Sequence, residues 1–402
     1  MKTPATSPPP IMLSTTPIKC KSQLERLFST YTCFCHPTLH AISKEMIPYM
    51  ISPMPVMDFL DSILPTYHLC NYSITRNLFN LKELFHRTAS ATDKLSMYTP
   101  FIEEMQKFTS DLHFRSTYSF KIKPDTSIYH KLNVDAFKQY SWDDSFLMPP
   151  QGQDRSTALF IGSTKNERAT LGQIGAYAAV HLASQFHTHC FSVYIAYHTA
   201  HIIQWDREGE IVTNFISFEV DNLLIEFFSQ YCQTPSELCG VDTTISCALE
   251  DKAMLARDVL CLPSDMAMFK TTLPRSGGGP PFLIISPCPD IMTTIPTCCS
   301  THTCPAYSPS EKCHVFFKDL WHVDADDITP EGEIHAVLDV KHVSFVSTCL
   351  ACICGEGLVV ISHVHYWLCM DLVGESLATF TSSQLLMQAV HDALTGRLHP
   401  SL

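Results

Sequence analysis

The sequence predicts an α+β protein, and two blocks of clear patterning carry this prediction. Between Gly172 and Tyr231 a helical pattern is followed by a meander of three strand-like runs and then by a second helix. Between residues 314 and 394 strand-like runs are joined by helices in a second block. No internal repeat with a fixed period of about 20–50 residues is present, so a solenoid or propeller is not expected.

The N-terminal part of the chain is expected to contain little regular structure. Residues 1–18 are rich in Pro, Ser and Thr and are typical of a disordered segment. From Ser22 to about Phe85 prolines interrupt short apolar runs, which argues against long helices. A helix is expected from Tyr98 through Phe108, and a strand-like segment follows at 120–129.

The first patterned block predicts a helix over 174–186, three strands and a second helix. The strands are expected at 190–197, 201–206 and 210–218, with Gly209 marking a turn. Asp221 is the expected cap of the second helix, because its carboxylate can accept a backbone N–H in the first turn.

The second patterned block begins after residues 293–310, which we expect to form a loop. The elements expected after it are a strand at 314–319, a helix at 331–341, strands at 357–362 and 365–373, and a helix at 382–394. Thr329 is the expected N-cap of the first helix, with Pro330 at its first position. Ser382 or Ser383 is the expected cap of the last helix.

These patterns, with a length of 402 residues, divide the chain into three regions. We expect a disordered, Pro-rich region at 1–97, an α+β domain at 98–260, and a third region at 261–402. The third region combines an antiparallel sheet with a helix.

Composition limits the possible functions. The net charge is 27 − 40 = −13, which argues against a general nucleic-acid binder, although a local basic site stays possible. The 18 cysteines are too few and too irregularly spaced for a disulfide scaffold. Neither a secretory signal at the N-terminus nor an apolar window of about 18 residues is found in the sequence. We therefore expect an intracellular protein, cytoplasmic or nuclear, that has reduced thiols and does not enter a membrane.

One pair of residues has the spacing of a nucleotide site. Lys318 ends an apolar strand, and Glu333 follows 15 residues later on the expected helix. In the small lobe of a protein kinase, a strand lysine contacts the α- and β-phosphates of ATP, and a helix glutamate pairs with that lysine. Taken alone, one lysine and one glutamate at this spacing are equally well explained as two solvated surface charges.

Longer segments resemble the fungal-type protein kinase family of mushroom-forming fungi. The run FKDLWHVD (317–324) followed by PEGEI (330–334) is the most specific of them, and the resemblance extends from about Tyr98 to Leu394. The resemblance implies an N-terminal α+β domain followed by a partial protein-kinase-like small lobe. It also implies that Lys318 orients ATP, that Glu333 is its partner, and that Met370 lies where a strand enters the hinge between the lobes. The implied cofactors are ATP and Mg²⁺.

The sequence departs from this family pattern in two places. The segment THTCPAYSPSEK (301–312) has no glycine where a glycine loop should precede the lysine strand, and Gly277–Gly279 lies 318 − 279 = 39 residues before Lys318. No His-Arg-Asp-like or Asp-Phe-Gly-like segment follows Lys318 before Leu402. We therefore expect this chain to be an inactive kinase-like protein that binds ATP poorly. Its exposed small-lobe face is expected to bind itself or an unknown protein partner.

A Mg²⁺-dependent nuclease is the first alternative. Pro124-Asp125, followed by an acid and a lysine, would be the metal pattern of restriction-endonuclease-like folds. Here Ala136 occupies the position of the acid before Lys138, and Asp135 lies one residue away, on the opposite face of a strand. A turn proline and a surface aspartate are the simpler interpretation.

A zinc-stabilised interaction module is the second alternative. The candidate ligands lie in three groups, and none has the paired spacing of a finger or ribbon. The groups are Cys33, Cys35 and His36; Cys298, Cys299, His302, Cys304, Cys313 and His314; and Cys349, Cys352 and Cys354. His187 and His189 beside Cys190 are a weaker candidate still.

Overall fold

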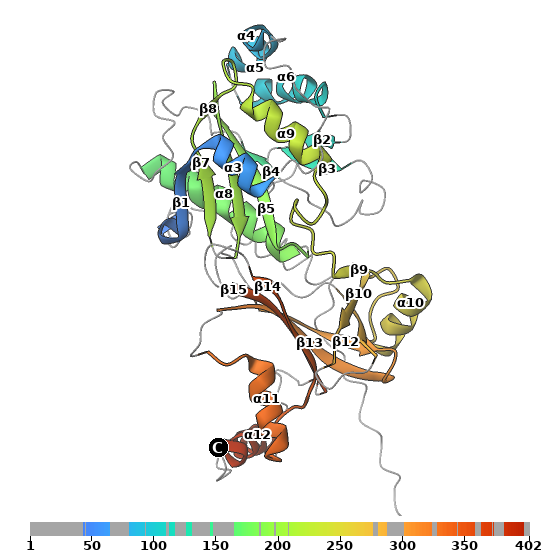
Figure 1. Cartoon of the computed structure of the whole chain (residues 1–402). Coiled ribbons are helices and arrows are strands. Elements are labelled where there is room, and N and C mark those ends of the chain that lie inside the picture. The colour runs from blue at the N-terminus through green and yellow to red at the C-terminus, as the bar shows by residue number, and fades with distance from the viewer. Residues whose placement is uncertain are drawn as a thin grey trace, which may run out of the picture.

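The computed structural model describes residues 43–64, 80–116, 126–130, 145–147, 165–287, 301–323, 328–357, 363–373 and 382–397, apart from short gaps inside these ranges. These residues form two β-sheets with helices packed against each (Figure 1). Figure 1 shows the first sheet, with β1 to β8, above the second sheet, with β9 to β15. The α+β class predicted from the sequence is confirmed.

The first sheet is mixed, with strand order β1-β7-β6-β5-β4-β3-β2 and β8 paired to β6. The β1–β7 and β4–β5 pairs are parallel, and the other pairs are antiparallel. Its strands are β1 Met50–Met54, β2 Leu112–Ser116, β3 Thr126–His130, β4 Ser145–Leu147, β5 His189–Ala196, β6 Thr199–Asp206, β7 Glu210–Thr213 and β8 Ile216–Ser217.

Helices cover both faces of this sheet, which explains why its central strands are buried at almost every position. Along β5 the side chains alternate between two cores, with Phe191 and Val193 in one and Cys190 and Tyr194 in the other. The first core includes side chains of α3, α6 and α9, and the second includes those of α8. The helices are η1 Ile47–Tyr49, α3 Val56–Ile63, α4 Leu81–Leu84, α5 His86–Ala89, α6 Lys94–Gln106, α8 Lys165–Ser184 and α9 Leu223–Gln233.

The second sheet is antiparallel throughout, with strand order β14-β15-β13-β12-β11-β10-β9. Its elements are β9 Ile245–Cys247, α10 Glu250–Val259, β10 Met268–Leu273, β11 Phe282–Pro287, β12 His302–Ser308, β13 Cys313–Val323, α11 Glu331–Val340, β14 Cys349–Gly357, β15 His363–Met370 and α12 Ser383–Arg397.

The two faces of the second sheet differ in what covers them. On β13 the side chains of Val315 and Phe317 are fully buried in a core with Phe282 of β11 and Trp367 of β15. The intervening residues of β13, among them Lys318, point to the other face. That other face is the one on which α11 lies, because Tyr366 of β15 bonds to the first turn of α11.

Most elements expected from periodicity are present at or near their predicted positions. The confirmed ones are the helices near 98–108, 174–186, 331–341 and 382–394 and the strands near 190–197, 201–206, 314–319 and 365–373. Ser382 caps the last helix, since its Oγ accepts the N–H of Leu385 at 3.3 Å. The strand at 120–129 is described only from Thr126, and most of 357–362 lies outside the described residues.

The domain boundaries differ from those expected. β1 and α3 lie within the range 1–97, and Phe59 of α3 is completely buried in the first core, so this range is not uniformly without structure. The described prolines of this range lie in or beside short elements, as Pro55 does at the N-cap of α3. The second sheet already begins at β9, well before residue 261, because β9 pairs with β10.

Four local predictions were wrong. Residues 302–308 form β12 although the range 293–310 was expected to be a loop. The strand expected at 210–218 is divided into β7 and β8. The residue at the N-cap of α11 is Pro330 rather than Thr329, and at that of α9 it is Asn222 rather than Asp221.

Among the described residues, none of the helices combines the length and apolar character that crossing a membrane requires.

Candidate functional site

Lys318 lies in the middle of the second sheet, where its position is set by strand register. It is opposite Thr303 of β12 and Leu368 of β15, both in antiparallel pairs. Its side chain is 20% exposed, so the aliphatic part packs on the sheet while the ammonium group reaches the surface.

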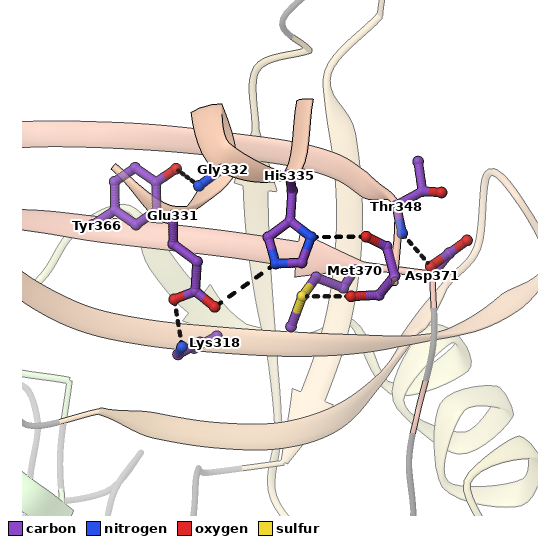
Figure 2. A network of polar contacts seen from close by, with 9 residues as sticks. Lys318, Glu331, Gly332, His335, Thr348, Tyr366, Met370 and Asp371 are labelled. Atoms are coloured by element: carbon purple, nitrogen blue, oxygen red, sulfur yellow. Dashed lines mark hydrogen bonds and ion pairs between the residues drawn. The ribbon is translucent and has the colours of Figure 1, made fainter. Parts of the chain in front are cut away.

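The helix α11 is held against this face of the sheet by its second residue, Gly332. The N–H of Gly332 donates to the hydroxyl of Tyr366 at 2.9 Å (Figure 2). A Cβ at position 332 would lie 2.2 Å from that hydroxyl oxygen and 2.8 Å from the Sγ of Cys352, so a larger residue would have to displace the helix. Glycine therefore permits the close approach that brings the start of α11 over the sheet.

The preceding residue, Glu331, forms an ion pair with Lys318. Its Oε2 lies 2.5 Å from the Nζ of Lys318, and its Oε1 lies 3.9 Å from the Nε2 of His335 one turn along the helix (Figure 2). The Nδ1 of His335 is 2.8 Å from the carbonyl oxygen of Ser347, to which it donates when it carries its proton. The carbonyl oxygen of Ser347 thus positions the histidine, the histidine flanks the carboxylate, and the carboxylate holds the lysine.

Glu333 is not the partner of Lys318, contrary to the sequence prediction. It lies two residues beyond Glu331, which is about 200° around an α-helix and so on the opposite side. Glu333 is accordingly exposed. A spacing argument could not distinguish the two acids, because both fall in the first turn; the glycine between them was the available sign that the sheet-facing side of the helix lies near Gly332.

Met370 lies on the same face of the sheet as Lys318, at the end of β15. It is opposite Phe316 of β13 and Cys349 of β14 and is 8% exposed. The hydroxyl of Ser347 donates to its Sδ at 3.2 Å, and Asp371 next to it accepts the N–H of Thr348 at 2.8 Å (Figure 2). The strand end is thus tied to the segment that also bonds His335.

Residues 301–312, where a kinase would have its glycine loop, contain no glycine and form β12 and its turn to β13. By register, Leu273 and Phe282 pair at the end of the β10–β11 hairpin that lies away from Lys318. The connection between β11 and β12 and the residues Gly277–Gly279 lie outside the described residues.

The described residues fit a nucleotide only in part. Lys318 offers one cation to a phosphate, and Glu331 orients it. No group of three or more His, Cys, Asp or Glu residues is placed to hold a metal ion in the part of the chain that the structure describes. Among the described residues, Lys318 is therefore the candidate partner for a phosphate.

The nuclease alternative falls on residues that the structure does not describe. Pro124, Asp125, Asp135, Ala136 and Lys138 all lie outside the described ranges. The strand β3 begins directly after Asp125, but this does not place a second carboxylate beside it. The nuclease stays a hypothesis.

The zinc alternative is tested for some of its residues. Cys33, Cys35, His36, Cys298 and Cys299 lie outside the described residues. His302 and Cys313 are at opposite ends of the β12–β13 hairpin, opposite Asp319 and Ser308 respectively. These two cannot share one ion in this fold.

Of the histidines at the end of α8 and the start of β5, His181 and His189 are buried and His187 is partly buried. Burial lowers the pKa of His187, and burial also lowers that of His189, whose Nε2 is 3.0 Å from the carbonyl oxygen of Leu238. Burial lowers the pKa of His181 to about 3, and its ring lies 4.9 Å from that of His187. All three are therefore neutral at ordinary pH, which agrees with a packing role.

Sequence reasoning missed a buried charged cluster on the opposite face of the second sheet. The Nε2 of His365 lies 2.6 Å from the Oδ1 of Asp319, and its Nδ1 lies 3.9 Å from the Oδ2 of Asp242. The ring of Trp321 stacks on His365 at 4.6 Å. Asp319 and His365 come from β13 and β15, which periodicity predicts, but periodicity does not predict that their polar side chains are buried together.

No protein-family model and no curated protein matches this chain.

Proposed function

We propose that residues 245–371 form a protein-kinase-like small lobe in which Lys318 contacts the phosphates of a nucleotide. The observation that supports this most is the Lys318–Glu331 ion pair, because the lysine comes from a central strand and the acid from the next helix. A kinase small lobe uses that arrangement to hold a cation at phosphate height. The role first expected of Glu333 belongs in this proposal to Glu331.

The geometry also supports a weak interaction rather than a tight one. A single partly exposed lysine supplies one charged contact to a phosphate. Lys318 is already paired with Glu331, so the phosphate has to share the lysine with this carboxylate or displace it. With a Kd of several millimolar, millimolar ATP would stabilise the protein by only about a few tenths of a kcal/mol. We expect the chain to bind ATP weakly and, as the sequence predicts, to transfer no phosphate.

Ligand-observed saturation-transfer NMR tests this proposal, because it detects millimolar binding directly. We expect ATP signals with the unaltered chain, a loss of most of the signal in Lys318→Met, and a reduction in Glu331→Gln. Glu333→Gln is the matched control, since it removes an acid from the same helix turn on the exposed side. A signal that survives Lys318→Met, or that depends on Glu333 rather than Glu331, would contradict the proposal.

A further inference from the structure

Two cysteines of β14 lie on one face of the sheet because of a bulge. Cys349 is opposite Met370, Ala351 is opposite Cys369, and Cys352 is opposite Leu368, so three steps on β14 match two steps on β15. In a regular strand, residues three apart point to opposite faces. Here both thiols share the side of Tyr366, Leu368 and Met370, and they pack against that cluster.

The bulge also shortens the distance between the two cysteines. Two steps along the partner strand correspond to roughly 6.6 Å. A disulfide joins Cα atoms about 4.4–6.8 Å apart, so this separation lies at the upper end of the permitted range. Both thiols are reduced in the structure and partly exposed, and a hydrogen bond joins their side chains.

The surroundings of the two sulfurs differ. The Sγ of Cys352 lies against the first turn of α11, where a Cβ on Gly332 would come within 2.8 Å of it. The amide groups at a helix N-terminus favour a thiolate. The nearby acid of that turn, Glu331, is paired with Lys318, which limits its opposition to a negative charge.

The two neighbours that form hydrogen bonds with Cys352, Cys349 and Tyr366, both have raised pKa values. The hydrogen bond with Cys352 and burial raise the pKa of Cys349. Burial and a hydrogen bond with Cys352 raise the pKa of Tyr366, whose oxygen already accepts the N–H of Gly332. Both neighbours therefore keep their protons, and the position of Cys352 at the start of α11 favours it as the attacking sulfur.

We propose that Cys352 and Cys349 form a redox-active dithiol that reduces low-molecular-weight disulfides such as oxidised glutathione. The thiolate of Cys352 attacks one sulfur of the disulfide, a mixed disulfide forms, and one glutathione thiolate leaves. Cys349 then loses its proton and attacks the Sγ of Cys352, which releases the second glutathione thiolate. The two protein thiols are oxidised to one disulfide, and one glutathione disulfide is reduced to two thiols. This chemistry does not depend on nucleotide binding.

The experiment exposes the reduced full-length chain to oxidised glutathione, then quenches it with acid and alkylates the remaining thiols. A protease that cleaves after glutamate releases residues 334–356, which contain Cys349, Cys352 and Cys354. We expect mass spectrometry of this peptide to show an internal disulfide between Cys349 and Cys352. Cys354→Ser is the control, because it should leave that disulfide intact.

The single variants distinguish the two roles. Cys349→Ser should accumulate a mixed disulfide of glutathione on Cys352, since no resolving thiol is left. Cys352→Ser should react at Cys349 no faster than the chain's exposed Cys261 does. Equal reactivity of the two variants, or a disulfide that requires Cys354, would overturn the proposal.

A measurement on the unaltered chain covers the case in which a variant fails to fold. The rate of alkylation of Cys352 is measured as a function of pH. We expect it to reach half its maximum at a pH below about 8.5, which is the pKa of a typical free cysteine. A midpoint at or above that value would equally overturn the assignment of Cys352 as the attacking thiol.

Discussion

At the scale of single residues, Glu210 on β7 is the clearest case of a buried ionisable group. It is 1% exposed, and neither of its carboxylate oxygens has a hydrogen-bond partner among the described residues. Burial, with a smaller contribution from the negative charge of Asp206, raises the pKa of Glu210 to about 8. The folded protein therefore keeps this proton at neutral pH, whereas the unfolded chain releases it near the ordinary glutamate value.

This difference predicts that stability falls as pH rises. Because the folded state binds the proton more tightly, the free energy of unfolding should decrease from about pH 5 to about pH 8, by on the order of 3 kcal/mol. Glu210→Gln removes the titrating group, so its stability should depend less on pH over this range. Urea unfolding at several pH values measures both. The exposed Glu237→Gln is the control, and identical pH profiles for Glu210→Gln and the unaltered chain would contradict the prediction.

At the scale of elements, periodicity located those strands and helices whose local pattern agrees with their environment. It failed for β12, because Pro305 and several polar residues suggest a loop. In the structure Pro305 lies opposite Phe316 of β13, and the register between β11 and β12 is fixed at Ile285 and Tyr307. Neighbouring strands therefore determine the conformation of β12, and a single sequence does not show them.

In the candidate site, too, contacts between distant parts of the chain decide what a single sequence does not show. The strand position of Lys318 and the following helix could be predicted, but the choice between two acids in one helical turn depends on how α11 is rotated. That rotation is set by the contact of Gly332 with Tyr366 on a strand 34 residues later. The dithiol depends on the bulge in β14, which follows from pairing with β15 and has no local sequence pattern.

The outer side of α11 carries an apolar stripe that we define as Ile334, Val337 and Val340. Their exposed fractions are 46%, 50% and 78%, and a spacing of three residues lines them along one side of the helix. We expect a second copy of the chain to cover this stripe, because exposed apolar side chains in one stripe are typical of an interaction surface.

Sedimentation velocity over a range of protein concentrations tests this expectation. Val337→Glu places a charge in the centre of the stripe and should shift the protein toward monomer. Val220→Glu is the matched control, because Val220 is 75% exposed on the first-sheet part of the chain. If both variants associate as the unaltered chain does, the stripe is not the surface through which copies meet.

At the scale of the whole molecule, buried charges join the two sheets. Arg207, in the turn between β6 and β7, is 2% exposed and lies close enough to Asp319 and His302 of the second sheet to influence the pKa of both. Asp242, in the segment that connects the sheets, approaches His365 of β15. The rings of Phe186 and Phe269 add an apolar contact between the two parts, with centroids 4.9 Å apart.

Asp319 is a buried carboxylate of this junction, 6% exposed. Burial alone would raise the pKa of Asp319, but His365, His302 and Arg207 together hold it below its ordinary value. A carboxylate with a lowered pKa stabilises the folded protein above the unfolded-state value of about 3.9, and this contribution is lost as the pH falls through the lower folded-state value. Acid should therefore weaken the contact between the sheets.

Asp319→Asn should have the same effect at neutral pH. The substitution removes the carboxylate that lies 2.6 Å from the Nε2 of His365 and that Arg207 of the first sheet also approaches, and breaking one side of a buried ion pair costs about 3–5 kcal/mol. Because the loss falls at the junction, we expect calorimetry to show two separate unfolding transitions where the unaltered chain shows one. Asp265→Asn, at an exposed position beyond α10, should keep the single transition. A single transition in Asp319→Asn, shifted no more than in this control, would mean that the two sheets are held together by their apolar contacts and not by these charges.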